Sequence, residues 1–504
     1  MLHKSSKTLL SLLQYSKGLN VRHFRCTAPA SQAANDIPEM PACSFKPSKH
    51  EGPDLNSVLS TRKNNLNPAL FTFYKEPVYV HQGYMQYLWD TNNKRYLDLF
   101  AGIVTVSVGH CHPAVVAAAE KQMKKLWHTT NIYLHPKIHE YAAQLVAKFP
   151  GNLKVVYFTN SGSEANDLAV LMARMYTGVY DCISLRNGYH GASPYLMGVT
   201  ALSTWRYNNP TGFGFQQAMN PDPYRGPWGG KHCRDSPAQP GRQCDCPQGQ
   251  CKACDMYVDQ LEDVLRYSMP KGRVGAFIAE AIQGVGGAVQ LPDGYLKKAY
   301  EKIRANGGVC IADEVQTGFG RMGSHYWGFE SQGVMPDIVT MAKGIGNGFP
   351  MGAVVTTPEI AATMGKALHF NTFGGNPVAS AVGQAVLEVI DKENIQGLCA
   401  DVGTYFIKEL EKLRNEFEVV GDVRGKGLMI GVELVKDKAS RTPLPAEEVA
   451  SIWEDTKNMG VLIGKGGLFG NCFRIKPPMC ITRADVDFSI AVMRAALRKH
   501  ANKK

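Results

Sequence analysis

The chain has 504 residues, 44% of them hydrophobic and 20% charged, which is the ordinary balance of a globular protein and enough length for more than one domain. The formal net charge is +11, but five basic and no acidic residues lie in positions 1–35, so the remaining 50 basic against 44 acidic residues give only +6. That mild excess, without a basic run, excludes a nucleic-acid surface. No apolar stretch approaches the ~18 residues of a membrane span.

The first stretch of the chain has the composition of a targeting segment. Leucines in positions 9–13 lie among basic and hydroxyl residues, which is typical of a mitochondrial transit peptide. A secretory signal is the weaker alternative because Lys17, Arg22 and Arg25 follow where a cleavage site should be, and an ordinary disordered terminus is the other. We assign residues 1–40 to a transit peptide and linker and predict a mitochondrial matrix protein.

Short strands are predicted next. Residues 78–80 and 87–90 read as a hairpin around Gln82-Gly83, and residues 96–99 as a further strand. We assign residues 41–110 to an N-terminal segment that contributes to a smaller domain.

Beyond residue 113, strands and helices alternate. Apolar runs at 155–158, 182–185, 274–279 and 309–313 are predicted strands, with helices at 164–176 and before 306. This βαβ pattern predicts an α/β fold with a mainly parallel sheet sandwiched by helices, in a large domain of residues 111–378. A helix at 379–393 and strands at 428–434 and 473–475 predict a smaller α+β domain over residues 379–504.

Two residues at predicted strand ends carry the main chemical signal. Asp313 ends the run Val-Cys-Ile-Ala-Asp, and Lys343 follows the run Ile-Val-Thr-Met-Ala. Ligands of open α/β sheets bind beyond the carboxyl ends of such strands. An amine and a carboxylate there match pyridoxal phosphate (PLP), whose aldehyde forms a Schiff base with a lysine and whose ring nitrogen needs an acid. A structural salt bridge between the two is the alternative.

Other candidate residues surround this pair. Ser161-Gly162-Ser163-Glu164 joins a strand to a helix and suits a phosphate, although a plain βα turn explains it equally. Six further residues are candidates, although each has an ordinary structural explanation when taken alone. They are the aromatic Tyr189, the apolar Val315, the amide Gln316, the hydroxyl Thr372 and the charged Arg474 and Glu280.

Together these motifs resemble the class III, or ornithine-type, aminotransferases of PLP fold type I, from about residue 70 to the C-terminus. The resemblance implies a large domain with a seven-stranded type of sheet, PLP as cofactor, and Lys343 and Asp313 as catalytic residues. It also implies that Gly162 and Ser163 hold the phosphate. Tyr189 and Val315 would sandwich the ring, and Gln316 would reach the ring hydroxyl.

The resemblance further implies an assembly and a substrate site. Thr372 would bind the phosphate of a neighbouring subunit's cofactor, so we expect at least a dimer, with a tetramer left open. Arg474 would bind the substrate carboxylate, and Glu280 would be its resting partner. Ala192 stands where ornithine and GABA enzymes have an arginine, and Ile103 where the ornithine enzyme has a tyrosine. Both favour a compact apolar substrate.

We therefore expect small amino acids and 2-oxo acids as partners, with the amino group moving from L-alanine to glyoxylate, and also from β-amino acids such as 3-aminoisobutyrate to pyruvate. The alternatives are a β-amino-acid–pyruvate aminotransferase, a phospho-lyase on the same scaffold, or a non-enzymatic metal-binding protein. The last arises from the cysteine-rich insertion at 230–256, where Cys251-x-x-Cys254 has zinc-like spacing. We interpret it as a surface insertion with free thiols and predict no metal.

Overall fold

The computed structural model describes residues 37–69, 72–247 and 250–503, and the transit peptide prediction falls on residues 1–36, outside the described part. The chain divides into two units, Met1–Ile37 and Pro38–Lys504. All the elements described below belong to the second unit.

A seven-stranded sheet carries the strand ends singled out above. Its order is β4-β12-β11-β10-β7-β5-β6. The bounds are β4 Val155–Thr159, β5 Cys182–Leu185, β6 Phe215–Ala218, β7 Ala276–Glu280, β10 Val309–Asp313, β11 Ile338–Met341 and β12 Gly352–Thr356. The pairs from β11 through β6 are parallel, and only β12 runs antiparallel to its neighbours. The predicted mainly parallel sheet is confirmed.

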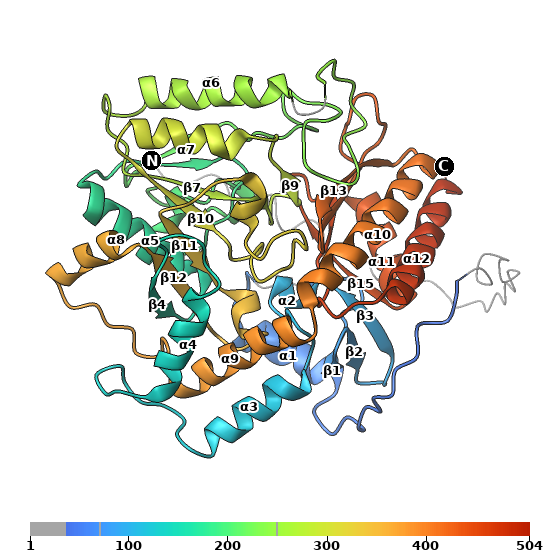
Figure 1. Cartoon of the computed structure of the whole chain (residues 1–504). Helices are drawn as coiled ribbons and strands as arrows, with labels where there is room; N and C mark the ends of the chain where they lie inside the picture. The colour runs from blue at the N-terminus through green and yellow to red at the C-terminus, as the bar shows by residue number, and fades with distance from the viewer. Residues whose placement is uncertain (1–36, 70–71, 248–249, 504) are drawn as a thin grey trace, which may run out of the picture. The chain divides into compact units, whose positions relative to one another are not determined.

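Helices cover both faces of this sheet because its strands are apolar on both sides. Along β7, Phe277 packs with α6 (Lys252–Tyr267) and α7 (Tyr295–Ala305), whereas the next residue, Ile278, packs with α5 (Gly162–Thr177). Successive side chains of a strand point to opposite faces. The sheet is therefore sandwiched, as Figure 1 shows.

A second sheet joins the two ends of the unit, in the order β1-β2-β3-β15-β16-β14-β13. Its bounds are β1 Val80–Tyr84, β2 Tyr87–Asp90, β3 Arg95–Leu99, β13 Val420–Lys426, β14 Met429–Leu434, β15 Val461–Gly466 and β16 Cys472–Ile475. The β3–β15 pair is parallel, and the other pairs are antiparallel. Pairing of β3 with β15 agrees with a contribution of the N-terminal segment to the smaller domain.

The remaining helices pack on this sheet or lead into it. The helices α10 (Ile395–Glu416), α11 (Ala446–Asn458) and α12 (Arg483–Ala501) gather beside β13 and β15 (Figure 1). The helix α9 (Pro377–Lys392) contacts α3 (Pro113–Met123) and α4 (Pro136–Val146). The shorter elements are α1 Leu55–Asn65, α2 Ala101–Val104, α8 Pro358–Thr363, β8 Ile282–Gln283 and β9 Val289–Gln290.

One predicted turn is wrong. The hairpin of β1 and β2 turns at Met85 and Gln86, and Gly83 lies inside β1. A Cβ at Gly83 would come 3.0 Å from Leu88 and 3.1 Å from His110. This glycine is therefore required by close packing rather than by a turn.

Within Pro38–Lys504 the chain forms one unit, so the predicted domain limits at 110 and 378 stay predictions. No helix of the described residues combines the length and the apolar character needed to span a bilayer.

Candidate active site

The carboxyl ends of neighbouring parallel strands bring three charged residues together. In the sheet register, Asp313 at the end of β10 lies opposite Glu280 on β7 and Thr340 on β11. Lys343 follows Thr340 by three residues, in the turn after β11. Both carboxylates are almost fully buried. The sheet thus places an amine and two carboxylates at one edge, as the sequence predicted for Asp313 and Lys343.

Two side chains hold Asp313 in place through the same carboxylate oxygen, Oδ2. His190 Nδ1 lies 2.7 Å and Asn166 Nδ2 2.9 Å from Oδ2, while Oδ1 accepts only the Val315 amide at 3.1 Å among the described contacts. Burial alone would lower the pKa of His190, but the hydrogen bond to Asp313 and its charge raise it. Oδ1 therefore keeps capacity for a further donor.

Asn166 and His190 were missed as functional residues. Both lie next to residues that the sequence analysis named for other reasons: Asn166 follows Ser161-Gly162-Ser163-Glu164 near the start of α5, and His190 follows Tyr189 after β5. The available signal was their polarity next to buried segments, because a buried amide or imidazole requires a partner. Only the fold shows that this partner is Asp313.

Lys343 is a half-buried lysine whose amine makes no hydrogen bond or ion pair to any residue that the structure describes. Its backbone lies in the left-handed region with φ 50°, a conformation that is strained for a residue with a side chain. Burial lowers the pKa of Lys343, the carboxylates of Asp313 and Glu280 oppose this shift, and Arg474 adds to it. A lysine with a lowered pKa has a larger fraction of the neutral, nucleophilic amine.

The predicted phosphate cradle lies at the N-terminus of α5. Ser161 caps the helix by accepting from the Glu164 amide at 3.2 Å, and the first N–H groups of a helix have no partner within it. A Cβ at Gly162 would come 3.1 Å from Val315 Cγ1 and 3.6 Å from Ala342. Gly162 therefore lets Val315 approach the start of α5, where backbone N–H groups and the helix dipole favour an anion.

Glu280 does not contact Arg474 in the way we predicted. Its two oxygens accept the backbone amides of Tyr189 at 3.2 Å and Gly284 at 2.7 Å. Within the described part of the chain no ion pair joins Glu280 to Arg474. The Gly284 amide follows four residues after Glu280, whereas the Tyr189 amide comes from the loop after β5. Backbone amides therefore satisfy the carboxylate, and sequence spacing gave no sign of this.

Arg474 on β16 donates instead to Gln316 Oε1 at 3.2 Å and stacks over the Phe100 ring. Its Nε is buried without a partner among the described residues. Burial lowers the pKa of Arg474 to about 10. An unsatisfied guanidinium N–H close to Lys343 is suited to a carboxylate ligand.

Lys476, two residues further along, was not predicted to take part. It is fully buried and donates to Gln316 Oε1 at 3.1 Å and to the Gly284 carbonyl at 3.0 Å. Burial and the Arg474 charge lower its pKa well below the ordinary value. Because two cationic groups face Oε1 of Gln316, the amide NH₂ of this side chain must point elsewhere.

Two predicted site residues, Ile103 and Thr372, lie further from Lys343, Asp313 and Arg474. Ile103 belongs to a left-handed turn with φ 65°, between Phe100, which contacts Arg474, and Ser107, which donates to the Gly344 carbonyl at 2.7 Å. Thr372 is exposed, in the loop before α9, and makes no described bond to the other site residues. Ile103 therefore borders the site, whereas Thr372 faces outward from the chain.

These residues fit PLP on structural grounds: a lysine amine without a partner among the described residues, a carboxylate whose Oδ1 accepts a single amide, a helix N-terminus suited to an anion, and a guanidinium whose Nε has no described partner. The Tyr189 backbone amide donates to Glu280, and Val315 lies beside Gly162.

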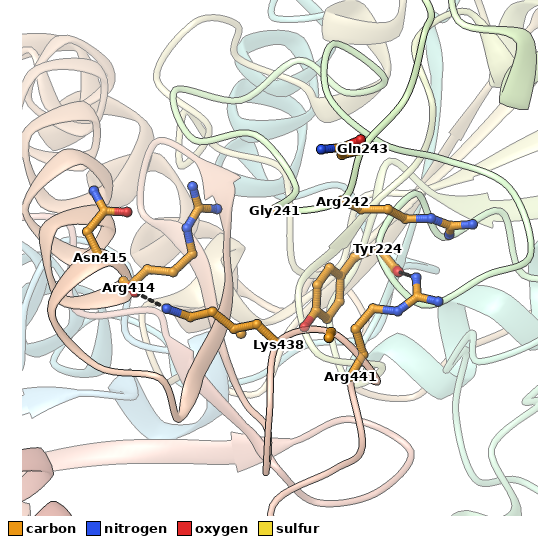
Figure 2. Close-up of a pocket in the computed structure, with 10 residues that line it drawn as sticks. Tyr224, Gly241, Arg242, Gln243, Arg414, Asn415, Lys438 and Arg441 are labelled. Atoms are coloured by element: carbon orange, nitrogen blue, oxygen red, sulfur yellow. Dashed lines mark hydrogen bonds between the residues drawn. The ribbon is translucent and has the colours of Figure 1, made fainter.

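A different cavity, of about 400 Å³, is drawn in Figure 2 and contains none of the predicted site residues. Its cations are turned to backbone carbonyls, for example Arg441 to Tyr224 and Lys438 to Arg414, each at 2.6 Å.

A mainly parallel sheet with a lysine and an acid at its strand ends defines a PLP enzyme of fold type I. Residues 74–497 match the family model of class-III aminotransferases. The chain belongs to this family, and it is a PLP-dependent aminotransferase.

Relatives and solved structures agree. The chain is 56% identical over 468 residues to human mitochondrial alanine–glyoxylate aminotransferase 2, covering 93% of this chain and 91% of the relative. It is 47% identical to Arabidopsis thaliana alanine–glyoxylate aminotransferase 2 homolog 2, mitochondrial, covering 94% and 96%.

Two solved structures are similar throughout. An Arthrobacter phospholyase in complex with phosphoethanolamine has a TM-score of 0.79 at 33% identity, covering 88% of this chain and 99% of that chain. A PLP-bound amine transaminase from an uncultivated Pseudomonas species has a TM-score of 0.78 at 31% identity, covering 86% and 98%.

Proposed function

We propose that this aminotransferase moves the amino group of L-alanine to glyoxylate, giving pyruvate and glycine, and also accepts β-amino acids such as 3-aminoisobutyrate with pyruvate as acceptor. The names of the human and Arabidopsis thaliana relatives support the first pair of substrates. The observation that carries the proposal is the amine of Lys343, which has no bonding partner among the described residues and follows β11, the strand beside the one that ends at Asp313.

Lys343 is the group that moves the proton. Bound PLP supplies an aldehyde that takes the amino group and a ring that withdraws electrons from the substrate's Cα–H bond. With PLP bound, Lys343 Nζ would take the substrate's Cα proton and later give a proton back, as base and then as acid. Burial lowers the pKa of Lys343, which favours the neutral amine that can accept a proton.

Asp313 would keep the ring nitrogen of PLP protonated through Oδ1, which accepts only the Val315 amide among the described contacts, because an adjacent carboxylate favours the charged form of a nitrogen base. His190 and Asn166 fix the carboxylate's orientation through Oδ2. Gly162 and Ser163 hold the phosphate with their backbone amides. Tyr189 and Val315 cover the two faces of the ring, and Gln316 donates to its hydroxyl through the NH₂ that Arg474 and Lys476 leave free.

Arg474 binds the substrate carboxylate and so orients the Cα–H bond toward Lys343. Ala192 is exposed and carries no charge, so no second carboxylate anchor comes from that position. Ile103, at the border of the site, adds an apolar surface. A small apolar side chain such as the methyl of alanine suits these two residues.

For assembly we propose at least a homodimer, in which Thr372 reaches the phosphate of the neighbouring subunit's cofactor. The exposure of Thr372 supports a role outside its own chain. The mitochondrial names of the relatives and the basic start of the sequence support a matrix location.

A second candidate is a phospho-lyase, because the Arthrobacter phospholyase has nearly the same fold. A screen of amino donors with glyoxylate and pyruvate, together with phosphate release from phosphoethanolamine, separates the two activities. Amino transfer from alanine without phosphate release supports the proposal, and phosphate release without amino transfer contradicts it.

The role of Lys343 is tested by Lys343→Ala. We expect activity to fall at least ~10²–10⁴-fold, because the variant loses the general acid–base group. Borohydride reduction of the wild type should fix the cofactor on Lys343, which peptide mass spectrometry can locate, and the variant should carry no adduct. Lys465→Met is the matched control, since Lys465 is a partly buried lysine that stacks on Trp453 instead. An adduct on another lysine in the wild type would refute the assignment.

A further inference from the structure

The cysteine-rich segment differs from the surface insertion that the sequence suggested. Cys233, Cys246, Cys251 and Cys254 are buried, and Cys244 is partly buried. Cys233 and Cys251 belong to the core between the large sheet and the helices α6 and α7. All cysteines in the described part of the chain are free thiols.

Three of these thiols converge, and a fourth contacts one of them. The sulfur atoms of Cys233, Cys244 and Cys246 all lie within 4.8 Å of one another. Cys251, the residue before α6, lies outside this group of three but interacts with the thiol of Cys233 through a side-chain hydrogen bond. Cys254, whose spacing from Cys251 looked most zinc-like, also lies outside the group.

The spacing of the thiols fits one metal ion. Cys233 Sγ and Cys244 Sγ are 3.8 Å apart. Four thiolates placed about 2.3 Å from a central zinc at tetrahedral angles are about 3.8 Å from one another. The observed distance is too long for a disulfide, whose sulfur atoms are about 2.05 Å apart. An iron–sulfur cluster would interpose its own sulfides and spread the thiols further.

The backbone around the thiols is arranged as in metal–thiolate sites. The Cys246 amide donates to Cys244 Sγ, and the Lys252 amide to Cys246 Sγ, each at 3.4 Å. Such hydrogen bonds stabilise the thiolate form that a metal requires. A Cβ at Gly230 would come 2.1 Å from the Cys244 Cβ, so the chain is folded closely around this thiol.

A metal cross-link would also explain how the long segment between β6 and α6 is held in place. Between β6 and α6 the structure has no helix or strand in its described residues, 219–247 and 250–251. A stretch of this length without secondary structure is uncommon inside a compact unit. Yet it makes fixed contacts with the second sheet: Arg234 forms a buried two-pronged ion pair with Asp422 on β13, at 2.9 and 3.0 Å. Figure 2 shows Gly241, Arg242 and Gln243 of this segment on the same cavity as Arg414 and Lys438.

We propose that Cys233, Cys244 and Cys246, with Cys251 as the fourth ligand, bind one structural zinc ion, which holds residues 230–247 against α6 and the second sheet. The thiols release their protons on binding, and no redox step is involved. The alternative is that the thiols are small apolar core residues without a metal. The amide donors and the 3.8 Å spacing of Cys233 and Cys244 favour the metal.

The test is metal analysis of the purified holoenzyme by plasma mass spectrometry, with zinc-edge X-ray absorption. We expect one zinc per chain with four sulfur neighbours at ~2.3 Å. Cys244→Ser, at the least buried of the four, should lose most of the zinc and lower the melting temperature. Cys254→Ser is the matched control, a buried cysteine three residues from Cys251, and should keep it.

Three results would overturn the proposal: wild-type enzyme that is active without any metal, iron in place of zinc, or loss of two titratable thiols to a Cys233–Cys244 disulfide. Should Cys244→Ser fail to fold, the stoichiometry and absorption spectrum of the wild type still decide. Neither readout depends on the proposed substrates, so the zinc proposal and the aminotransferase proposal can fail separately.

Discussion

Among single residues, Arg474 has the environment most specific to substrate binding. Its guanidinium is buried, shares Gln316 with Lys476 and keeps an unpartnered Nε. A carboxylate ligand would satisfy this N–H and offset the cost of its burial. Lysine in its place keeps the charge but loses the planar two-pronged geometry.

We expect Arg474→Lys to raise the KM for alanine roughly 10–100-fold, since a hydrogen bond to a charged group contributes about 1.5–3 kcal/mol. Steady-state kinetics measure this effect. The control is an amine donor without a carboxylate, for which KM should hardly change. Equal losses for both donors would show that Arg474 supports the fold of the site rather than binding the carboxylate.

At the scale of elements, the cysteine-rich segment and β13 are joined by a buried charge cluster. Asp422 faces Arg234, Arg424 at 3.0 Å and Arg414 at 3.9 Å. Burial alone would raise the pKa of Asp422, but the guanidinium groups of Arg234 and Arg424 outweigh it and lower the pKa to about 2. Removing one partner of such a cluster leaves a buried carboxylate less well compensated.

The lowered pKa of Asp422 makes stability depend on pH. A carboxyl whose pKa is lower in the folded state stabilises the fold above its unfolded value, 3.8, and this contribution is lost as pH falls through about 2. The contribution is roughly 2 kcal/mol. Arg234→Met should reduce stability at neutral pH and flatten the pH dependence between 4 and 2, as measured by denaturant unfolding.

Arg483→Met is the control for this measurement, because the ion pair of Arg483 with Asp401 is exposed. Exposed ion pairs contribute little to stability. An equal effect of both variants would argue against a special role for the buried cluster.

At the scale of the whole molecule, an exposed apolar patch adjoins Thr372. Two loops meet there through a hydrogen bond from Asn131 to the Gly374 carbonyl at 3.0 Å. Its apolar members are Trp127, Ile132, Tyr133, Leu134, Leu368, Phe370 and Phe373. Contiguous exposed apolar surface of this kind marks an interface. Its position supports a dimer contact beside the residue expected to reach the neighbouring cofactor.

Leu134 is 90% exposed and tests this contact. We expect Leu134→Asp to dissociate the dimer, because it places a charge in an apolar interface, and to weaken cofactor retention with it. Sedimentation equilibrium and cofactor absorbance after gel filtration measure the two effects. Tyr267→Asp, at an exposed aromatic residue at the end of α6, should leave both unchanged. An unaltered mass for Leu134→Asp would place the interface elsewhere.

The sequence by itself determined the scaffold and the central chemistry. Buried parallel strands are continuous apolar runs, so β10 was located at residues 309–313, and the residues after such strands could be read as ligand-facing. The fold class and the PLP aminotransferase family are confirmed, whereas the role of each site residue stays a prediction.

Only the tertiary structure decided which side chains meet. Glu280 accepts the backbone amides of Tyr189 and Gly284 instead of pairing with Arg474. His190 and Asn166 hold Asp313, Lys476 shares Gln316 with Arg474, and Cys233, Cys244 and Cys246 converge. Most of these contacts join residues far apart in the chain, and strand order and loop path set them. A sequence gives the periodicity of each element but not the direction in which a buried polar group finds its partner.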